Sequence, residues 1–149
     1  MIEKPAIYTS GSIEYSKDPD SWRLKMLKSL HFRYNVIIPD SKGCPYDKTE
    51  EEYKSWIKKE FIMPDMISVA TSQYFFVKLD AAVFKGAGTI SELTTACWLG
   101  KHIVYMLDKI EEKDIPGWTL GCLTGAIKVS SIDEAIELYK NLNKPFKGE

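Results

Sequence analysis

A glutamate near the start of an expected helix is the first residue whose setting suggests chemistry. The stretch KGAGTISEL (85–93) places two glycines and Thr89 ahead of Glu92. The positive end of a helix favours an ionised carboxylate, which is the form that a nucleophile needs. Thr89 and Glu92 also fit a capping box, in which two side chains satisfy each other's backbone N–H groups. The stretch therefore predicts either a nucleophile or a plain helix cap.

Asp80 is a second carboxylate in a position where sites are often built. It ends the strand-like stretch QYFFVKLD (73–80), at the edge where α/β sheets bind ligands. If packing of the strand desolvates Asp80 and raises its pKa, Asp80 is the better proton donor of the two carboxylates. It fits a turn or a helix cap equally well. Gly86 and Gly88 follow, and the N–H groups after Thr89 are suited to a phosphate or a sugar hydroxyl.

A second loop, TSGSIEY (9–15), has the composition of an anion-binding turn. Gly11 permits close approach of a ligand to the backbone, and Ser12 adds a hydroxyl donor. The alternative is an ordinary Ser/Gly turn. Trp22, shortly after this loop, is expected in the core, with stacking on a base as the alternative. Lys78, inside an apolar strand, either extends to the sheet edge or pairs with a carboxylate of the site.

The elements that must position these residues alternate between strand and helix. Short apolar strands are expected at 6–10, 35–40, 73–80, 102–107 and 126–130. Helices are expected at 21–34, 49–72, 89–100 and 131–143, the second kinked or divided at Pro64. This alternation predicts an α/β fold with a parallel sheet, whose ligand edge lies after Ser10, Asp40 and Asp80.

Three local features complete this prediction. Further capping boxes are expected at Thr49 with Glu52 and at Ser131 with Glu134. Cys97 is expected to point into the core. The connection at 108–125 is long for a loop, and its part at 116–124 is a candidate lid.

Composition narrows the classes of function. The 149 residues fit one domain, 1–149, and a net charge of −1 with dispersed Lys and Arg argues against a nucleic-acid polymer as partner. We expect no signal peptide, and no apolar run reaches the ~18 residues of a membrane span. Cys44, Cys97 and Cys122 are far apart and odd in number, so we expect no disulfide framework and no zinc site. A reduced, cytoplasmic compartment fits this pattern.

Four stretches together resemble the nucleoside 2-deoxyribosyltransferase superfamily, which includes nucleoside 5′-monophosphate N-glycosidases. They are IYTSGSIEY, the Trp-Arg pair at 22–23, NVIIPD and DAAVFKGAGTISELTTACWLGKHIVYML, between Ile7 and Leu107. The resemblance implies a flavodoxin-like three-layer fold with a five-stranded parallel sheet in the order 2-1-3-4-5. It implies a small-molecule nucleoside or nucleotide as partner, and no metal or redox cofactor. It also implies a homodimer or higher homo-oligomer.

The resemblance assigns roles to individual residues. Glu92 stands where the family has its nucleophile, in a G-T-x-x-E-L-x-x-A context. Tyr8 matches the tyrosine that holds the nucleophile, and Asp80 matches the aspartate that assists the leaving base. The predicted substrate-binding residues are Gly11, Ser12, Ile13, Trp22, Gly86, Gly88 and Thr89.

The substrate and the catalytic state are left open by the sequence. Lys85 to Gly88 replace an acidic residue that many family members carry before the G-T pair, and phosphate-binding serines are not evident around Gly86. Nucleoside or nucleotide, ribose or deoxyribose, and hydrolysis or transfer therefore stay as alternatives. The G-T-x-x-E core also resembles cytokinin-activating phosphoribohydrolases, although their Pro-Gly-Gly is absent here. A nucleotide-binding module in which Glu92 is only a cap, and a structural subunit with a vestigial site, are the non-catalytic alternatives.

Overall fold

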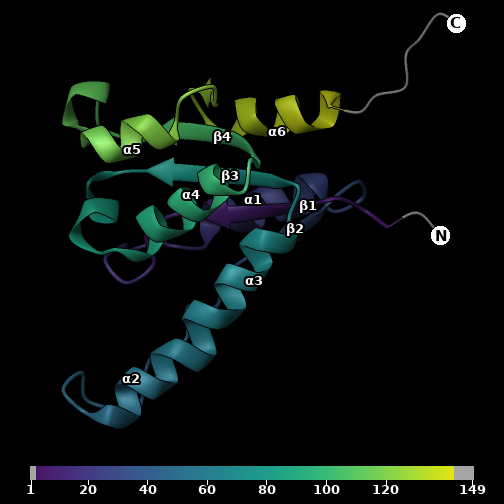
Figure 1. Ribbon diagram of the computed structural model, residues 1–149. Coiled ribbons are helices and arrows are strands. Elements are labelled where there is room, and N and C mark those ends of the chain that lie inside the picture. The colour runs from purple at the N-terminus through teal and green to yellow at the C-terminus, as the bar shows by residue number, and fades with distance from the viewer. Residues whose placement is uncertain (1–2, 143–149) are drawn as a thin grey trace, which may run out of the picture.

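One parallel sheet of five strands forms the centre of the protein (Figure 1). The computed structural model describes residues 3–142. The strands are β1 (Ala6–Ser10), β2 (Asn35–Ile37), β3 (Tyr74–Leu79), β4 (His102–Leu107) and β5 (Ile127–Val129). Their order is β2-β1-β3-β4-β5 and every pairing is parallel. The predicted α/β flavodoxin-like fold with strand order 2-1-3-4-5 is confirmed.

Helices connect the strands and cover both faces of the sheet. They are α1 (Ser21–Leu30), α2 (Glu51–Ile57), α3 (Met63–Thr71), α4 (Gly88–Trp98), α5 (Gly117–Cys122) and α6 (Ile132–Asn141). The shorter helical segments are η1 (Lys58–Ile62), η2 (Ala81–Lys85) and η3 (Glu112–Asp114). The helix predicted at 21–34 ends earlier, at Leu30. The chain then turns, and the Asn35 N–H donates to the Pro5 carbonyl at 2.9 Å as β2 begins. The helix predicted at 131–143 corresponds to α6, which ends at Asn141. Residue 143 lies outside the described residues.

Alternation along the strands sends neighbouring side chains into two different cores. Tyr8 and Val77 belong to the core that packs against α3, α4 and α5. Ile7 and Phe76 belong to the core under α1 and α6. Since side chains alternate with a period of two along a strand, Ser10 lies on the face of Tyr8, while Lys78 lies on the opposite face.

The predicted division at Pro64 takes the form of a change in helix type. Helices α2 and α3 form one rod that extends away from the sheet, with η1 between them (Figure 1). Pro64 has no N–H to donate to a carbonyl one turn earlier. The preceding turn is a π-helix, in which the Met63 N–H bonds the Lys58 carbonyl. No helix among residues 3–142 is long and apolar enough to cross a membrane.

Of the capping boxes predicted for α2 and α6, the structure contradicts the first and shows the Ser131 bond of the second. Helix α2 begins at Glu51 without a side-chain cap, so the box predicted at Thr49 is wrong. At α6 the Ser131 hydroxyl accepts the Glu134 N–H at 3.1 Å, as predicted. The Glu134 carboxylate accepts from the Ser130 N–H instead, at 2.7 Å.

Two other predictions about buried segments also change. Cys97 is exposed, so its predicted inward orientation is wrong. The long connection at 108–125 contains η3 and α5. Thr119, Cys122 and Leu123 are buried there, and the Trp118 indole donates to Thr94 of α4 at 3.0 Å. The segment proposed as a lid is therefore a short helix packed against α4.

Candidate active site

Glu92 lies in the second turn of α4 and is buried, with 8% of its surface exposed. The helix begins at Gly88 after Ala87 and has no side-chain cap. The capping box predicted for Thr89 and Glu92 is therefore wrong. The Glu92 carboxylate points instead to the carboxyl end of β1, where both of its oxygens accept hydrogen bonds.

Tyr8 and Ser10 hold this carboxylate from β1. The Tyr8 hydroxyl donates a short hydrogen bond to Glu92 Oε2. The Ser10 hydroxyl donates to Glu92 Oε1 at 2.7 Å. The two donors are two positions apart on one strand and so lie on the same face. The Tyr8 ring stacks on Phe75 of β3 with centroids 5.8 Å apart, which limits the directions in which its hydroxyl can point.

Burial gives Glu92 an unusual acidity. It raises the pKa of Glu92 from 4.5 to about 7, against the hydrogen bonds from Tyr8 and Ser10, which lower it. The nearby charge of Asp65 raises this pKa further, and that of Arg23 lowers it. The sequence led us to expect an ionised carboxylate stabilised by the helix N-terminus. Desolvation outweighs that effect, because the carboxylate is almost wholly removed from water.

Burial also keeps Tyr8 in the form that donates. It raises the pKa of the Tyr8 phenol far above its ordinary value, and the Glu92 charge raises it further. Tyr8 therefore stays protonated at any pH at which the protein works, and its hydroxyl remains a hydrogen-bond donor to Glu92.

Asp65 is a carboxyl near Glu92 that the sequence analysis did not identify. It lies in the first turn of α3, after Pro64. Burial raises the pKa of Asp65 from 3.8 to about 6, the Asp40 charge raises it further, and Arg23 opposes both. An acidic residue in the first turn of a helix is common for stability alone, so only the tertiary structure distinguishes this one.

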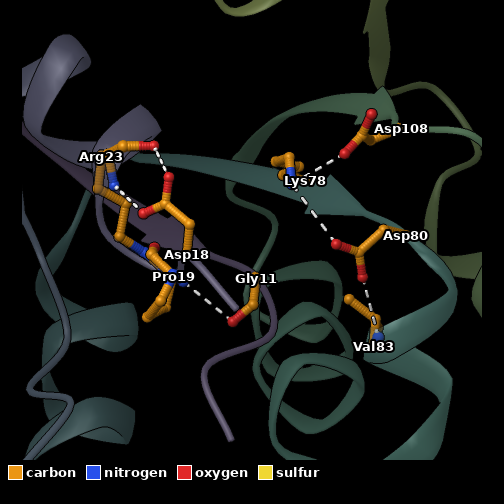
Figure 2. A network of polar contacts seen from close by, with 9 residues as sticks. Gly11, Asp18, Pro19, Arg23, Lys78, Asp80, Val83 and Asp108 are labelled. Carbon is orange, nitrogen blue, oxygen red and sulfur yellow. Dashed lines mark hydrogen bonds and ion pairs between the residues drawn. The ribbon is translucent and has the colours of Figure 1, made fainter. Parts of the chain in front are cut away.

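Arg23 on α1 ties together the loop that follows β1. It is fully buried. Its guanidinium donates to the Gly11 carbonyl at 2.9 Å (Figure 2), to the Thr9 carbonyl at 3.3 Å and to the Pro19 carbonyl. These acceptors stand at the two ends of the loop, so one side chain fixes both. Nothing in the sequence indicated this role beyond an arginine beside the apolar positions of the helix.

Gly11 is needed here for packing rather than for access to a ligand. A Cβ at this position would lie 3.0 Å from Trp22 Cζ2 and 3.4 Å from Arg23 Nη2. Trp22 is buried in the core under α1 and packs against Phe76. The Arg23 Cζ atom lies 4.4 Å from the centroid of the Trp22 ring and covers its face. This environment supports the core interpretation of Trp22 and leaves little of its ring for a base.

The other predicted binding residues surround the same edge of the sheet. Ser12 and Ile13 are half-buried in the loop after β1. Thr89 is buried, whereas Gly86 and Gly88 are exposed at the start of α4. Their contact with a substrate stays a prediction.

Asp80 is engaged with a different set of partners. Its carboxylate accepts the Val83 N–H at 3.1 Å, which caps η2, and lies 3.4 Å from the Lys78 ammonium. The same ammonium lies 3.1 Å from Asp108 (Figure 2). Lys78 thus pairs with a candidate site carboxylate, one of its two predicted alternatives. Within residues 3–142, Asp80 forms no hydrogen bond with Glu92.

The fold and the site together define a class of protein: a flavodoxin-like domain with a buried carboxylate held at the carboxyl end of β1. Two solved structures share the fold. A CMP N-glycosidase from Clostridium botulinum aligns with a TM-score of 0.54 at 16% identity, over 91% of this chain and 98% of its own. A 2-deoxyribosyltransferase from Bacillus psychrosaccharolyticus aligns with a TM-score of 0.63 at 16% identity, over 95% of this chain and 93% of its own.

At 16% identity, both comparisons show that the fold is shared. No protein-family model matches the chain. No curated protein matches it by sequence either.

Proposed function

We propose that this protein cleaves or transfers the N-glycosidic bond of a nucleoside or nucleoside 5′-monophosphate, with Glu92 as the nucleophile. The observation that carries the proposal is the double hydrogen bond from Tyr8 and Ser10 to a buried Glu92 at the ligand edge of the sheet. The shared fold with a CMP N-glycosidase and a 2-deoxyribosyltransferase supports the same class of reaction.

The proposed chemistry follows from the state of Glu92. The ionised carboxylate attacks C1′ as the C1′–N bond breaks, through an oxocarbenium-like transition state, and forms a glycosyl ester. A proton passes from a neighbouring carboxyl group to the departing base. Water then hydrolyses the ester, or a second base takes the sugar. A pKa of about 7 leaves a large share of Glu92 ionised near neutral pH.

Two carboxyl groups are candidates for the proton donor. Asp80 is the residue that the family resemblance assigns, and it lies at the end of β3 beside Lys78. Asp65 is the candidate that the structure adds. Its raised pKa of about 6 keeps part of it protonated near neutral pH, and its charge acts on Glu92. A donor with a pKa near the working pH is the more effective one, which favours Asp65.

The alternative of a non-catalytic nucleotide-binding module takes Glu92 as a helix cap. Helix α4 has no side-chain cap, and the carboxylate bonds β1 instead. A buried carboxyl with a raised pKa costs stability when it ionises, so its retention is easier to explain by chemistry than by structure. The phosphoribohydrolase alternative uses similar bond cleavage and differs in substrate.

We further propose that the protein forms a homodimer or higher homo-oligomer through the rod of α2, η1 and α3. Within this rod the rings of Trp56 and Phe61 pack on each other, with centroids 4.8 Å apart. The large apolar side chains that the rod leaves exposed are Ile62, Met63 and Ile67, each with 50–60% of its surface accessible to solvent. A cytoplasmic location stays a prediction, with Cys44, Cys97 and Cys122 all free thiols.

The direct test is a panel of nucleosides and nucleoside 5′-monophosphates incubated with the protein, with free base detected by chromatography. We expect release of base from at least one substrate class, and none from the Glu92→Ala variant. The proposal fails if no substrate is cleaved, or if Glu92→Ala cleaves as fast as the parent protein.

A further inference from the structure

A cavity of about 340 Å³ lies between the loop after β1 and the ends of β3 and β4. Tyr15, Ser16 and Lys17 form one wall, and the η2 segment from Asp80 to Lys85 forms another. Asp108 and Lys109, directly after β4, complete the lining. The cavity is at the carboxyl edge of a parallel sheet, which is where proteins of this architecture bind ligands.

The charges around this cavity leave an excess of unpaired cations. Within residues 3–142, no hydrogen bond or ion pair is formed by the ammonium groups of Lys17, Lys85 and Lys109. The carboxylates of Asp80 and Asp108 both pair with Lys78 (Figure 2). One lysine thus offsets the acids while three lysines from three segments have no partner. Most other described lysines do have one, such as Lys25, which pairs with Asp133 at 2.7 Å.

Lys109 also has an unusual backbone. Its φ is +57°, and among residues 3–142 it is the only residue other than glycine with a positive φ. A side chain in this left-handed region is disfavoured, because its Cβ crowds the following carbonyl oxygen. Such conformations concentrate where a site needs a side chain in a particular place, and here the place is the rim of the cavity.

The same two loops border Glu92. The β1 strand ends at Ser10, which bonds Glu92, and the chain then continues to the cavity wall at Tyr15. The η2 segment leads directly into α4, which carries Glu92. The loops touch each other at Gly86, where a Cβ would lie 3.2 Å from the Tyr15 ring. Both segments that form the cavity walls therefore continue directly into the elements that hold or carry Glu92.

We propose that this cavity binds a phosphomonoester dianion through Lys17, Lys85 and Lys109. Resting on the proposed function, the ligand is the 5′-phosphate of a nucleotide whose glycosidic bond lies at Glu92, which makes nucleoside 5′-monophosphates the substrate class. Ammonium groups are strong partners for phosphate oxygens. Free inorganic phosphate carries the same chemistry, so the experiment separates the two sources.

The first measurement is independent of activity. Inorganic phosphate is titrated into the full chain at constant ionic strength, and binding is followed by chemical-shift changes in the NMR spectrum, with chloride as the reference anion. We expect saturable shifts in the parent protein, weakened about tenfold or more by Lys85→Gln or Lys109→Gln. Lys28→Gln is the matched control, because Lys28 is exposed on α1 and its ammonium forms no hydrogen bond or ion pair within residues 3–142. Absence of saturable binding, or equal weakening by the control, overturns the site.

The second measurement identifies the source of the phosphate. For a nucleotide substrate, Lys85→Gln raises KM for the monophosphate about tenfold or more and changes KM for the matching nucleoside less than twofold. Equal changes for both substrates overturn the assignment of the 5′-phosphate, and phosphate binding without any preference for monophosphates assigns the cavity to the free anion. If neither substrate is cleaved, the proposed function fails, while the phosphate titration still decides the site.

Discussion

The Tyr8 hydroxyl donates a hydrogen bond to Glu92 Oε2 across 84 positions of sequence. The phenol is buried on β1 and the carboxylate is buried on α4, so neither has water as a substitute partner. Ser10, on the same face of β1, occupies the other carboxylate oxygen. Helix and strand are thereby joined at Glu92, the proposed nucleophile.

Replacing Glu92 by Gln separates a nucleophile from a structural carboxylate. The amide has the same shape and can still bond Tyr8 and Ser10, but it cannot attack C1′. We expect kcat to fall by about 10³-fold or more, with substrate affinity kept close to that of the parent protein and the melting temperature not lowered. Steady-state kinetics, equilibrium binding and thermal unfolding of both proteins provide the check. Turnover within tenfold of the parent would remove Glu92 from the chemical step.

The same variant reveals the energetic cost of burying the carboxylate. Because the pKa of Glu92 rises from 4.5 to about 7 on folding, the folded protein holds this proton more tightly than the unfolded chain. This contribution to stability is fully present below pH ~4.5 and is lost as the pH rises through about 7. We expect the free energy of unfolding of the parent, relative to Glu92→Gln, to fall by on the order of 3 kcal/mol between these limits. Urea denaturation at several pH values measures it, and a constant difference would contradict the raised pKa.

The sequence predicted the fold better than it predicted the partners within the site. The alternation of strands and helices was accessible because apolar periodicity is written in consecutive residues. The strand order and the pairing of Tyr8 with Glu92 followed from the family resemblance. Ser10 could have been found as well, since it follows Tyr8 by two positions on one strand. Arg23 could not, because its carbonyl acceptors depend on how the loop folds over α1.

Carboxylates were the hardest residues to place from sequence. Asp80 and Asp65 both stand at the ends of secondary-structure elements, where an acid is common. The alternation along β3 puts Lys78 on the face away from Glu92, and Asp80 then bonds Lys78 and Val83. The proximity of Asp65 depends on the packing of α3 beside the site, which no local pattern encodes.

Removing either hydrogen-bond donor to Glu92 shifts the pH dependence of activity in a defined direction. The bonds from Tyr8 and Ser10 lower the pKa of Glu92, so Tyr8→Phe and Ser10→Ala each raise it. We expect the limb of the kcat/KM profile near pH 7, which reports Glu92 in the free enzyme, to move to higher pH in both variants. A limb that stays in place, or moves to lower pH, would show that it does not report Glu92.

Asp65→Asn and Asp80→Asn identify the proton donor when compared on two kinds of substrate. With a base that leaves poorly, loss of the donor is expected to lower kcat by about 10²–10⁴-fold. With a nucleoside whose base is already cationic, the same variant should lose little, because that base departs without a proton. We expect this pattern for Asp65→Asn. The pattern in Asp80→Asn instead would return the role to the residue that the family resemblance assigns.

The exposed apolar side chains of the α2–α3 rod predict how the protein assembles. Ile67 is 60% exposed on α3, so its replacement removes little packing within its own chain. If the rod is an interface, Ile67→Asp places a charge inside it, and we expect a shift from dimer or higher oligomer to monomer. Leu24→Asp is the matched control, since Leu24 is 44% exposed on α1. Sedimentation equilibrium of the three proteins gives the masses. A monomeric parent, or an assembly that survives Ile67→Asp but not Leu24→Asp, would move the interface away from the rod.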